Sequence, residues 1–317
     1  MGNLLNIRRP AFLWLISFLL LFRECISSSF ASSLACAGFN LEKPILNEEQ
    51  ITAYQRDGFL VLPYFICADA CETLCRRAEE LVQAFDDSLL PHLFQRYQGH
   101  IPWEDVYLEQ GDTLCFFFEE AAFLADGSFR EGKERAVKKI SYALHAKDPL
   151  FQAFSYQPRI QRLLQDLHIA DPLILQSMHF FKQPYIGSAV GCHQDAAFLH
   201  TAPEPIIGLW FALEDATIDN GCLWVLPGGH SNGLKWKCIK NEQGKRDYEV
   251  YDETEWEYAK MVPVEVKKGS LVIMHGYLPH LSEANRSERS RQAFALHVMS
   301  GASRYLDSNC LPFLFNR

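Results

Sequence analysis

Six short apolar segments in the C-terminal half of this 317-residue chain constrain its fold more than any other feature. Each is rich in β-branched and aromatic residues, and clusters of glycine, proline and asparagine separate them. The segments cover residues 172–182, 206–213, 222–226, 262–266, 270–275 and 291–299. Short strands at this spacing are typical of a β-sandwich or barrel rather than a parallel βαβ sheet. The sequence therefore predicts a mainly β core.

Helices are expected on the N-terminal side of this core. Asn47 and Gln50 form a capping-box pattern for a helix to about Arg56, and Gly58 would end it. A strand at residues 59–63, an amphipathic helix at 68–86 and a helical pattern over 150–164 follow. We expect residues 87–136 to form irregular structure over the core, and the charged stretch 235–260 to be an inserted surface loop.

Composition excludes several classes of protein. The chain has 30 Lys and Arg against 39 Asp and Glu, a net charge of -9, and no long basic run, which argues against nucleic acid as a partner. Its ten cysteines are scattered through apolar contexts rather than paired in CxxC units. This pattern argues against a zinc ribbon or a disulfide scaffold and predicts mostly reduced core thiols.

The first 45 residues are predicted to be a leader separate from a catalytic domain at 46–317. Two arginines, an apolar run at 11–22 and a Ser/Ala stretch are typical of a signal peptide, a short membrane anchor or an organelle leader. The run at 11–22 could associate with a membrane. The scattered cysteines and the sequon at Asn285 argue against secretion, so the compartment stays open, with the cytoplasm expected if the leader is not functional.

The segment His193-Gln194-Asp195 is the first candidate metal site. On an extended segment His193 and Asp195 point to the same side, while Gln194 faces away. Two imidazoles and one carboxylate can bind one face of an Fe(II) ion and leave its other positions open. The pattern therefore indicates an oxygen-activating enzyme if a second histidine completes the set.

Three downstream histidines could supply the remaining ligand. His230 lies in a tight Pro-Gly-Gly turn, where a histidine more often anchors a loop by a hydrogen bond. His275 lies in the predicted strand 270–275, and His280 follows the bend at Pro279. Spacing to a carboxylate anchor favours His280, and His275 is its nearest rival.

Arg291 is the candidate anchor for a carboxylate. Its planar guanidinium can bind a carboxylate through two parallel hydrogen bonds, and Ser282 could add a hydroxyl. Arg291, Ala293, Ala295 and His297 are predicted to share one face of the last strand, where the small residues leave room for a bound diacid. Judged alone, Arg291 would more often form a surface salt bridge.

Several segments together resemble the phytanoyl-CoA dioxygenase family of Fe(II)/2-oxoglutarate oxygenases over about residues 47–300. They are Asp57-Gly58-Phe59-Leu60-Val61-Leu62, Ala143-Leu144-His145-Ala146, Gln176-Ser177-Met178, Phe181-Lys182-Gln183-Pro184, His193-Gln194-Asp195, Glu214-Asp215-Ala216-Thr217, Asn220-Gly221-Cys222-Leu223-Trp224 and Arg289-Ser290-Arg291-Gln292-Ala293. The resemblance implies a double-stranded β-helix (jelly roll, cupin-like) with flanking helices. One departure is Gly228-Gly229-His230, where relatives commonly have Gly-Ser-His.

The resemblance also implies the roles of individual residues. His193, Asp195 and His280 would bind the iron, and Arg291 with Ser282 would hold the co-substrate 2-oxoglutarate. Lys139, Met178 and Trp210 are implied as further co-substrate neighbours.

The expected activity is hydroxylation of a small organic or lipid-like substrate, an acyl-CoA among the candidates, with use of O2 and release of succinate and CO2. The alternatives are a jelly roll that binds metal or lipid without turnover and a zinc hydrolase. Intact Arg291 and Ser282 argue against the first, and Arg291 would have no evident role in the second.

Overall fold

The computed structural model describes residues 42–89, 114–203, 205–242 and 245–310, and the apolar run at 11–22 lies outside them. The helices are α3 (Glu48–Asp57), α4 (Ala68–Gln83), α7 (Lys133–Ala136), α8 (Leu144–Lys147), α9 (Pro149–Ser155) and α10 (Pro158–Asp166). Within the described part of the chain, no helix combines the length and hydrophobicity that a transmembrane segment needs.

The core consists of two antiparallel sheets. The larger has the strand order β1 (Phe59–Leu62), β12 (Leu271–His275), β7 (Ile207–Ala212), β14 (Ala293–Met299), β4 (Leu173–Phe180), β3 (Val137–Tyr142) and β2 (Cys115–Phe118). The smaller has the order β11 (Val262–Val264), β8 (Leu223–Val225), β13 (His280–Ser282) and β5 (Val190–His193). The mainly β core and the strands predicted from the six apolar segments are confirmed.

Side chains along each strand of the large sheet point alternately to its two faces, and both faces are covered by other parts of the protein. One set, which includes Trp210 and Val272, packs against Leu223 and Val225 of the small sheet. The space between the sheets is therefore lined by side chains of both.

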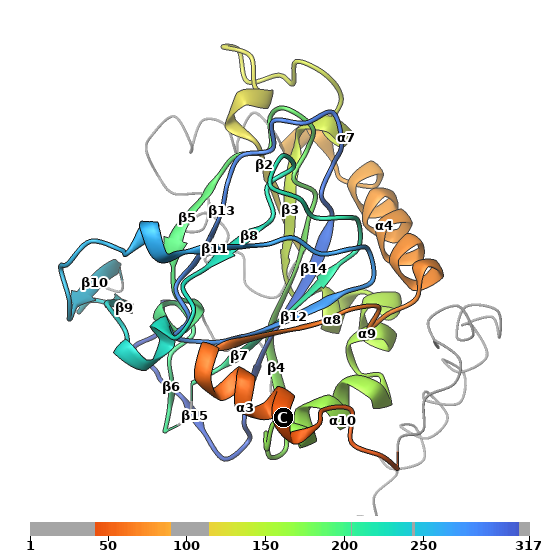
Figure 1. The fold of residues 1–317 in the computed structure, drawn as a ribbon. Coiled ribbons are helices and arrows are strands. Elements are labelled where there is room, and N and C mark those ends of the chain that lie inside the picture. The colour runs from red at the N-terminus through yellow and green to blue at the C-terminus, as the bar shows by residue number, and fades with distance from the viewer. Residues whose placement is uncertain (1–41, 90–113, 204, 243–244, 311–317) are drawn as a thin grey trace, which may run out of the picture.

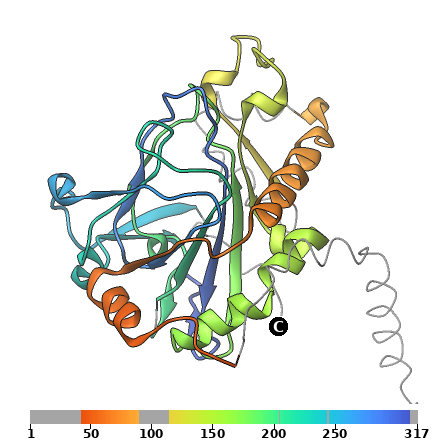
Figure 2. The same cartoon turned by 45° about the vertical axis from the view of Figure 1, so that its right-hand side comes forward.

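The opposite set of side chains forms the main hydrophobic core beneath the helices. Phe211 and Phe294 of the sheet contact Phe154 of α9, and Phe294 also contacts Phe151 at a centroid distance of 4.9 Å. Figures 1 and 2 show α4, α8, α9 and α10 on the side of the large sheet that is turned away from the small sheet. The helices thus cover one face and leave the other to the site.

The predicted capping box at the start of α3 is also confirmed. Asn47 accepts a hydrogen bond from the Gln50 backbone, and the Gln50 side chain accepts one from the Asn47 backbone. Gly58 ends α3 in the left-handed conformation at φ 79°, which a residue without Cβ adopts at little cost. The chain then enters β1, whose partner in the large sheet is β12.

Two regions differ from the sequence prediction. The aromatic run at Phe116–Phe118 was expected to be irregular, but it belongs to β2, which is buried at all four positions and pairs with β3. The stretch 235–260 was expected to be a loop, but it contains an antiparallel hairpin of β9 (Trp236–Lys240) and β10 (Arg246–Val250). Residues 90–113 of the predicted irregular segment 87–136 lie outside the described residues.

A disulfide joins this hairpin to the C-terminal segment. Cys238 in β9 is bonded to Cys310, with their Cα atoms 6.0 Å apart, close to the two-stranded ribbon of β6 (Thr201–Ala202) and β15 (Arg304–Tyr305). The other described cysteines are free thiols: Cys67, Cys71, Cys75, Cys115, Cys192 and Cys222. The prediction of mostly reduced thiols holds for these six and is wrong for the bonded pair.

Replacing Phe294 by alanine should destabilise the protein strongly. The ring is fully buried among three other phenylalanine rings, so truncation leaves a cavity and should cost about 3–5 kcal/mol in the free energy of unfolding. Urea denaturation followed by circular dichroism measures the difference. Tyr156→Ala is the matched control, because Tyr156 is 47% exposed and should cost less than 1 kcal/mol by comparison. Equal losses for the two variants would contradict this account of the core.

Candidate active site

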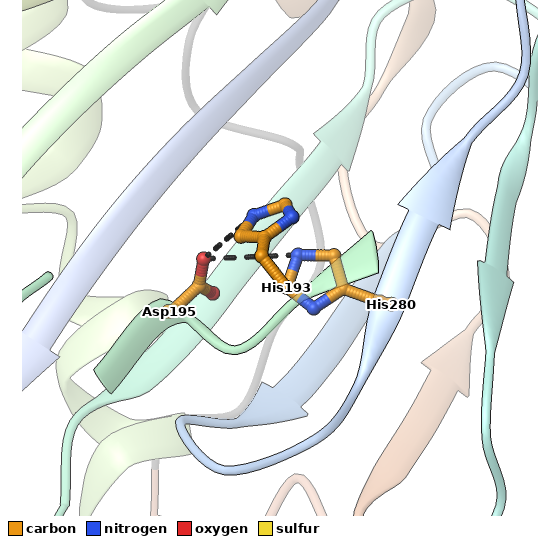
Figure 3. Close-up of side chains that lie close together, drawn as sticks. All are labelled: His193, Asp195 and His280. Atoms are coloured by element: carbon orange, nitrogen blue, oxygen red, sulfur yellow. Dashed lines mark ion pairs between the residues drawn. The ribbon is translucent and has the colours of Figure 1, made fainter. Parts of the chain in front are cut away.

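The three sequence-predicted metal ligands meet between the two sheets. His193 ends β5, and His280 begins β13 directly opposite it, because the two strands pair in antiparallel register. Asp195 is the first residue of a 3-10 turn (Asp195–Ala197) that follows β5. Figure 3 shows the Asp195 carboxylate pointing toward both imidazoles. The prediction that His193 and Asp195 reach one place is confirmed, although only His193 lies on the strand.

The ligand atoms are close enough to share one ion. Asp195 Oδ1 lies 3.6 Å from His193 Nε2 and 3.7 Å from His280 Nε2, and the two ring centroids are 4.3 Å apart. Among the described residues, these three form the group of ligating side chains within 4.8 Å of one another. Metal–ligand bonds of about 2.0–2.2 Å are compatible with these separations.

Both imidazoles are oriented for metal binding by the same backbone device. His193 Nδ1 lies 2.9 Å from the Gly191 carbonyl oxygen, and His280 Nδ1 lies 3.0 Å from that of Leu278. A carbonyl accepts only, so each Nδ1 carries the proton and each Nε2 presents a lone pair to the common centre. Metal-ligating histidines in proteins are commonly fixed in this way. The residues present therefore fit a divalent metal ion.

The charges of the site also suit a cation. Burial by itself would raise the pKa of Asp195, but the surrounding imidazoles of His297, His280 and His193 hold it well below its usual range. Burial and the neighbouring His193 lower the pKa of His280 to about 4, so His280 is neutral near pH 7. An ionised carboxylate beside a neutral imidazole is the protonation state that a metal ion requires.

Gln194, between the two ligands, faces away as predicted and has a structural role. Its side-chain amide donates to the carbonyl oxygens of Gly233 and Tyr277, each at 2.7 Å, and its oxygen accepts from the Lys235 backbone at 2.9 Å. These bonds tie the His193–Asp195 segment to the start of the β9–β10 hairpin and to the segment that precedes His280.

A cavity extends from the three ligands to Arg291. Its lining is Met178, Phe180, Val190, His193, Asp195, Trp210, Leu223, Met274, His280, Leu281, Ser282, Arg291, Ala295 and His297. The structure thus brings Met178, Trp210 and Ser282 to the ligands, as the family resemblance implied. Ala295 lies opposite both Trp210 and Met178 on adjacent strands, and its small side chain leaves the cavity open between them.

Arg291 is buried and lacks a described acidic partner. It is 3% exposed, its Nε donates to the Gly221 carbonyl oxygen at 3.1 Å, and its Nη2 contacts Ser282 Oγ at 3.4 Å. Among the described residues Nη1 has no hydrogen-bond partner, and the guanidinium lies 5.2 Å from the Trp210 ring centroid. A surface salt bridge, the alternative that the sequence left open, is therefore wrong. A buried guanidinium with an unused donor fits a carboxylate ligand.

Lys139 lies near the site without lining the cavity. It pairs with Phe180 across β3 and β4, and its ammonium lies 4.4 Å from the Phe117 ring centroid. Burial lowers the pKa of His193, but the hydrogen bond and charge of Asp195 raise it overall, and the charge of Lys139 opposes that rise only slightly. The implied role of Lys139 at the co-substrate remains a prediction.

Lys182 is a second buried basic residue beside Arg291, and no role for it was predicted from the sequence. Its Nζ donates to Ser282 Oγ and to the Ser188 carbonyl oxygen, both at 2.8 Å, and its own carbonyl oxygen accepts from the Arg291 backbone at 3.3 Å. Burial, and then the charge of Arg291, lower the pKa of Lys182 to about 7. Only its presence in a family segment pointed to it, because β4 ends before it and no periodicity indicates its direction.

The rival histidines lie outside the cavity. His230 Nε2 contacts the Gln55 carbonyl oxygen at 3.1 Å, which is the loop-anchoring role that its turn indicated. The His275 ring lies 4.9 Å from that of His230, and its Nδ1 accepts from the Tyr277 backbone. Neither belongs to the group of potential ligands.

The sequon at Asn285 is part of the fold. Asn285 is fully buried, and its side-chain amide donates to the carbonyl oxygens of Lys182 and Arg289 at 2.9 and 2.7 Å. Its side-chain oxygen accepts from the backbone and hydroxyl of Ser287. A glycan on this amide would remove the bonds that hold the segment before Arg291.

The chain is similar in sequence to one described family. Residues 54–293 match the family described as Phytanoyl-CoA dioxygenase (PhyH). The chain is 38% identical over 270 residues to phytanoyl-CoA dioxygenase domain-containing protein 1 of Rattus norvegicus, covering 81% of this chain and 91% of that protein. It is 40% identical over 254 residues to phytanoyl-CoA dioxygenase 1 of Oryza sativa subsp. japonica, covering 80% and 89%.

Solved structures share the fold. The crystal structure of EctD from S. alaskensis with 2-oxoglutarate and 5-hydroxyectoine matches with a TM-score of 0.59 at 17% identity, covering 90% of this chain and 88% of that one. The non-heme alpha ketoglutarate dependent carbocyclase SnoK matches with a TM-score of 0.56 at 17% identity, covering 86% and 90%. The predicted double-stranded β-helix is confirmed.

The buried ammonium of Lys182 should make stability depend on pH. Its pKa is about 7 in the folded chain against 10.5 in the unfolded chain, so the unfolded state holds more protons between these values. The contribution of Lys182 to the free energy of unfolding is therefore lowest below pH 7 and rises toward pH 10.5. The wild type should gain stability relative to Lys182→Met by up to about 1.4 kcal/mol per pH unit above pH 7.

Urea denaturation of both proteins at pH 6.5, 7.5, 8.5 and 9 measures this difference. Glu119, Lys138 and Glu283 also face Lys182, and the substitution removes its electrostatic interaction with each of them. Lys267→Met is the control, since Lys267 is exposed and the bond to Asp215 raises its pKa, which keeps it protonated in both states. A difference between wild type and Lys182→Met that stays constant with pH would contradict the assignment.

Proposed function

The chain belongs to the phytanoyl-CoA dioxygenase family, and on that premise we propose that it hydroxylates a small organic or lipid-like substrate with release of succinate and CO2. As a member of this family it is a 2-oxoglutarate-dependent dioxygenase that uses Fe(II), 2-oxoglutarate and O2. The observation that carries the proposal is one cavity with two complementary ends. His193, Asp195 and His280 lie at one end, and at the other lies Arg291, whose Nη1 has no partner among the described residues.

We assign the metal to His193 Nε2, His280 Nε2 and one oxygen of Asp195. These three residues would hold an Fe(II) ion and would leave room on it for the co-substrate and oxygen. When bound, the iron supplies the redox chemistry that activates oxygen. The protein contributes the orientation of both imidazoles through the Gly191 and Leu278 carbonyls.

Arg291 and Ser282 are assigned to the distal carboxylate of 2-oxoglutarate. The free Nη1 of Arg291 offers a charge-assisted hydrogen bond, and the Ser282 hydroxyl lies beside it on the same wall of the cavity. Met178 and Trp210 would pack against the carbon chain between the two ends, since both line the cavity. Lys139 would act at longer range, because it does not line the cavity. It lies on β3, opposite Phe180 of β4, which does.

The substrate class follows from the rest of the lining. Phe180, Val190, Leu223, Met274 and Leu281 surround the ligands with apolar surface, which suits the hydrocarbon part of a substrate. The relatives are named for phytanoyl-CoA, and an acyl-CoA ester is therefore one candidate.

A second candidate function is a jelly roll that binds metal or lipid without turnover. Such a protein would have no use for a buried arginine without an acidic partner in the described part of the chain, and this observation favours the enzyme. The two proposals differ in whether 2-oxoglutarate is consumed.

The first test concerns the metal ligands. Asp195→Ala and His280→Ala should lose Fe(II) binding, measured anaerobically by equilibrium dialysis, because each removes one of three ligands. His275→Ala is the matched control, since this histidine lies outside the cavity and should bind Fe(II) as the wild type does. Normal binding by His280→Ala together with loss in His275→Ala would reverse the assignment.

The second test concerns the co-substrate. The anaerobic Fe(II) protein should develop a visible metal-to-ligand charge-transfer band with 2-oxoglutarate and release succinate when oxygen is admitted. Arg291→Ala should raise the 2-oxoglutarate concentration needed for half of the band by about 10- to 100-fold, since charged hydrogen bonds contribute about 1.5–3 kcal/mol. Arg289→Ala is the exposed control and should leave it unchanged. An iron-loaded wild type without a band would favour the non-catalytic jelly roll.

A further inference from the structure

We propose that His297 and Gly208 act together as a positioning device that restricts Asp195 to one-oxygen metal binding. The inference depends on the proposed function, because it takes His193, Asp195 and His280 as the metal ligands. His297 lines the cavity on β14 but has been given no role so far.

The two oxygens of Asp195 face different groups. Oδ1 lies 3.6 and 3.7 Å from the Nε2 atoms of His193 and His280, whereas Oδ2 lies 3.2 Å from His297 Nε2. The carboxylate is 8% exposed, so water competes little for either oxygen. Oδ1 is therefore the oxygen available to a shared ion, and Oδ2 is occupied by the third imidazole.

The proton of His297 is placed by its surroundings. His297 Nδ1 is buried and has no hydrogen-bond partner in the part of the chain that the structure describes, so a proton there would be an unsatisfied buried donor. With the proton on Nε2 the ring donates to Asp195 Oδ2. Nδ1 is then an unpaired acceptor, which costs less than an unpaired buried N–H donor. His297 thus donates to the oxygen that faces away from the other two histidines.

Gly208 provides the space that this arrangement needs. It pairs with His297 across β7 and β14, so the two residues lie side by side beneath the carboxylate. A Cβ at position 208 would lie 3.1 Å from Asp195 Oδ2 and would press on the carboxylate. The absent side chain and the imidazole together define where Oδ2 can lie.

This restriction has a chemical consequence. A carboxylate that bound through both oxygens would take two positions on the metal, and with two imidazoles and a chelating 2-oxo acid no position would be left for oxygen in a six-coordinate ion. Occupying Oδ2 with a hydrogen bond disfavours that mode. His297 is a positioning residue, since it acts through Asp195.

The test measures Mn(II) binding by electron paramagnetic resonance of the free ion, on the full-length protein without substrate. His297→Leu should raise the Kd for Mn(II) by about 10- to 100-fold, the usual effect of removing a hydrogen-bond partner of a metal ligand. His297→Gln, whose amide can donate to the same oxygen, should restore the Kd to within about threefold of the wild type. Gly208→Ala should weaken binding in the same direction.

The outcomes separate the two levels of the proposal. A wild type that fails to bind Mn(II), or an Asp195→Ala variant that binds it normally, would overturn the proposed ligand set itself. Normal ligand behaviour with an unchanged Kd in His297→Leu would overturn the role of His297 alone. Equal losses in the folded Leu and Gln variants would also overturn it, because they would show packing rather than a donated hydrogen bond. If His297→Leu does not fold, as judged by circular dichroism, His297→Met replaces it in the same comparison.

Discussion

Buried charge around one cavity is the constraint on which the whole site depends. The Asp195 carboxylate lies between three imidazoles that hold its pKa well below its usual range, while Arg291 and Lys182 lie together with no described carboxylate in contact. Charges removed from water without partners cost several kcal/mol each. A divalent cation held by Asp195 and a dianion held by Arg291 would bring an opposite charge to each end of the cavity. Binding of either ligand to the folded state should therefore also stabilise it.

The protein can contain such a cavity because its stability comes mainly from the hydrophobic core on the other face of the large sheet. The phenylalanine cluster under the helices, formed by Phe151, Phe154, Phe211 and Phe294, lies on the opposite face of the same strands. Each strand of the large sheet thus contributes alternate side chains to a dry core and to the site. Because side chains alternate strictly, β14 can hold Phe294 in the core and Ala295 in the cavity without any irregularity at that point.

The sequence predicted the elements whose signals are local. The capping box at Asn47, the six strand segments and the pair His193 and Asp195 depend on short-range patterns, and the structure confirms them. Spacing to Arg291 and the family resemblance both favoured His280 over His275, but it is the pairing of β13 with β5 that brings His280 opposite His193. Spacing along the chain contains no information about that register.

The failures have a similar physical origin. The run at Phe116–Phe118 lacks alternation because both faces of β2 are buried, so its pattern could not be distinguished from irregular structure. The pairing of Cys238 with Cys310 spans 72 residues and depends on where the β9–β10 hairpin docks. Lys182 and His297 were visible as residues, but their roles come from contacts with Ser282 and Asp195 across the fold.

The β9–β10 hairpin shows how the inserted segment is coupled to the ligands. Gln194 forms hydrogen bonds to Gly233 and Lys235 at the base of the hairpin. The Phe198 ring lies between the hairpin and the site, with its centroid 5.1 Å from that of Trp236 and 6.2 Å from that of His193. The hairpin base is thus fixed by the same short segment that carries two of the three ligands. A change at this base would reach His193 and Asp195 through direct contacts, whereas the exposed outer residues of the hairpin can vary without moving either ligand.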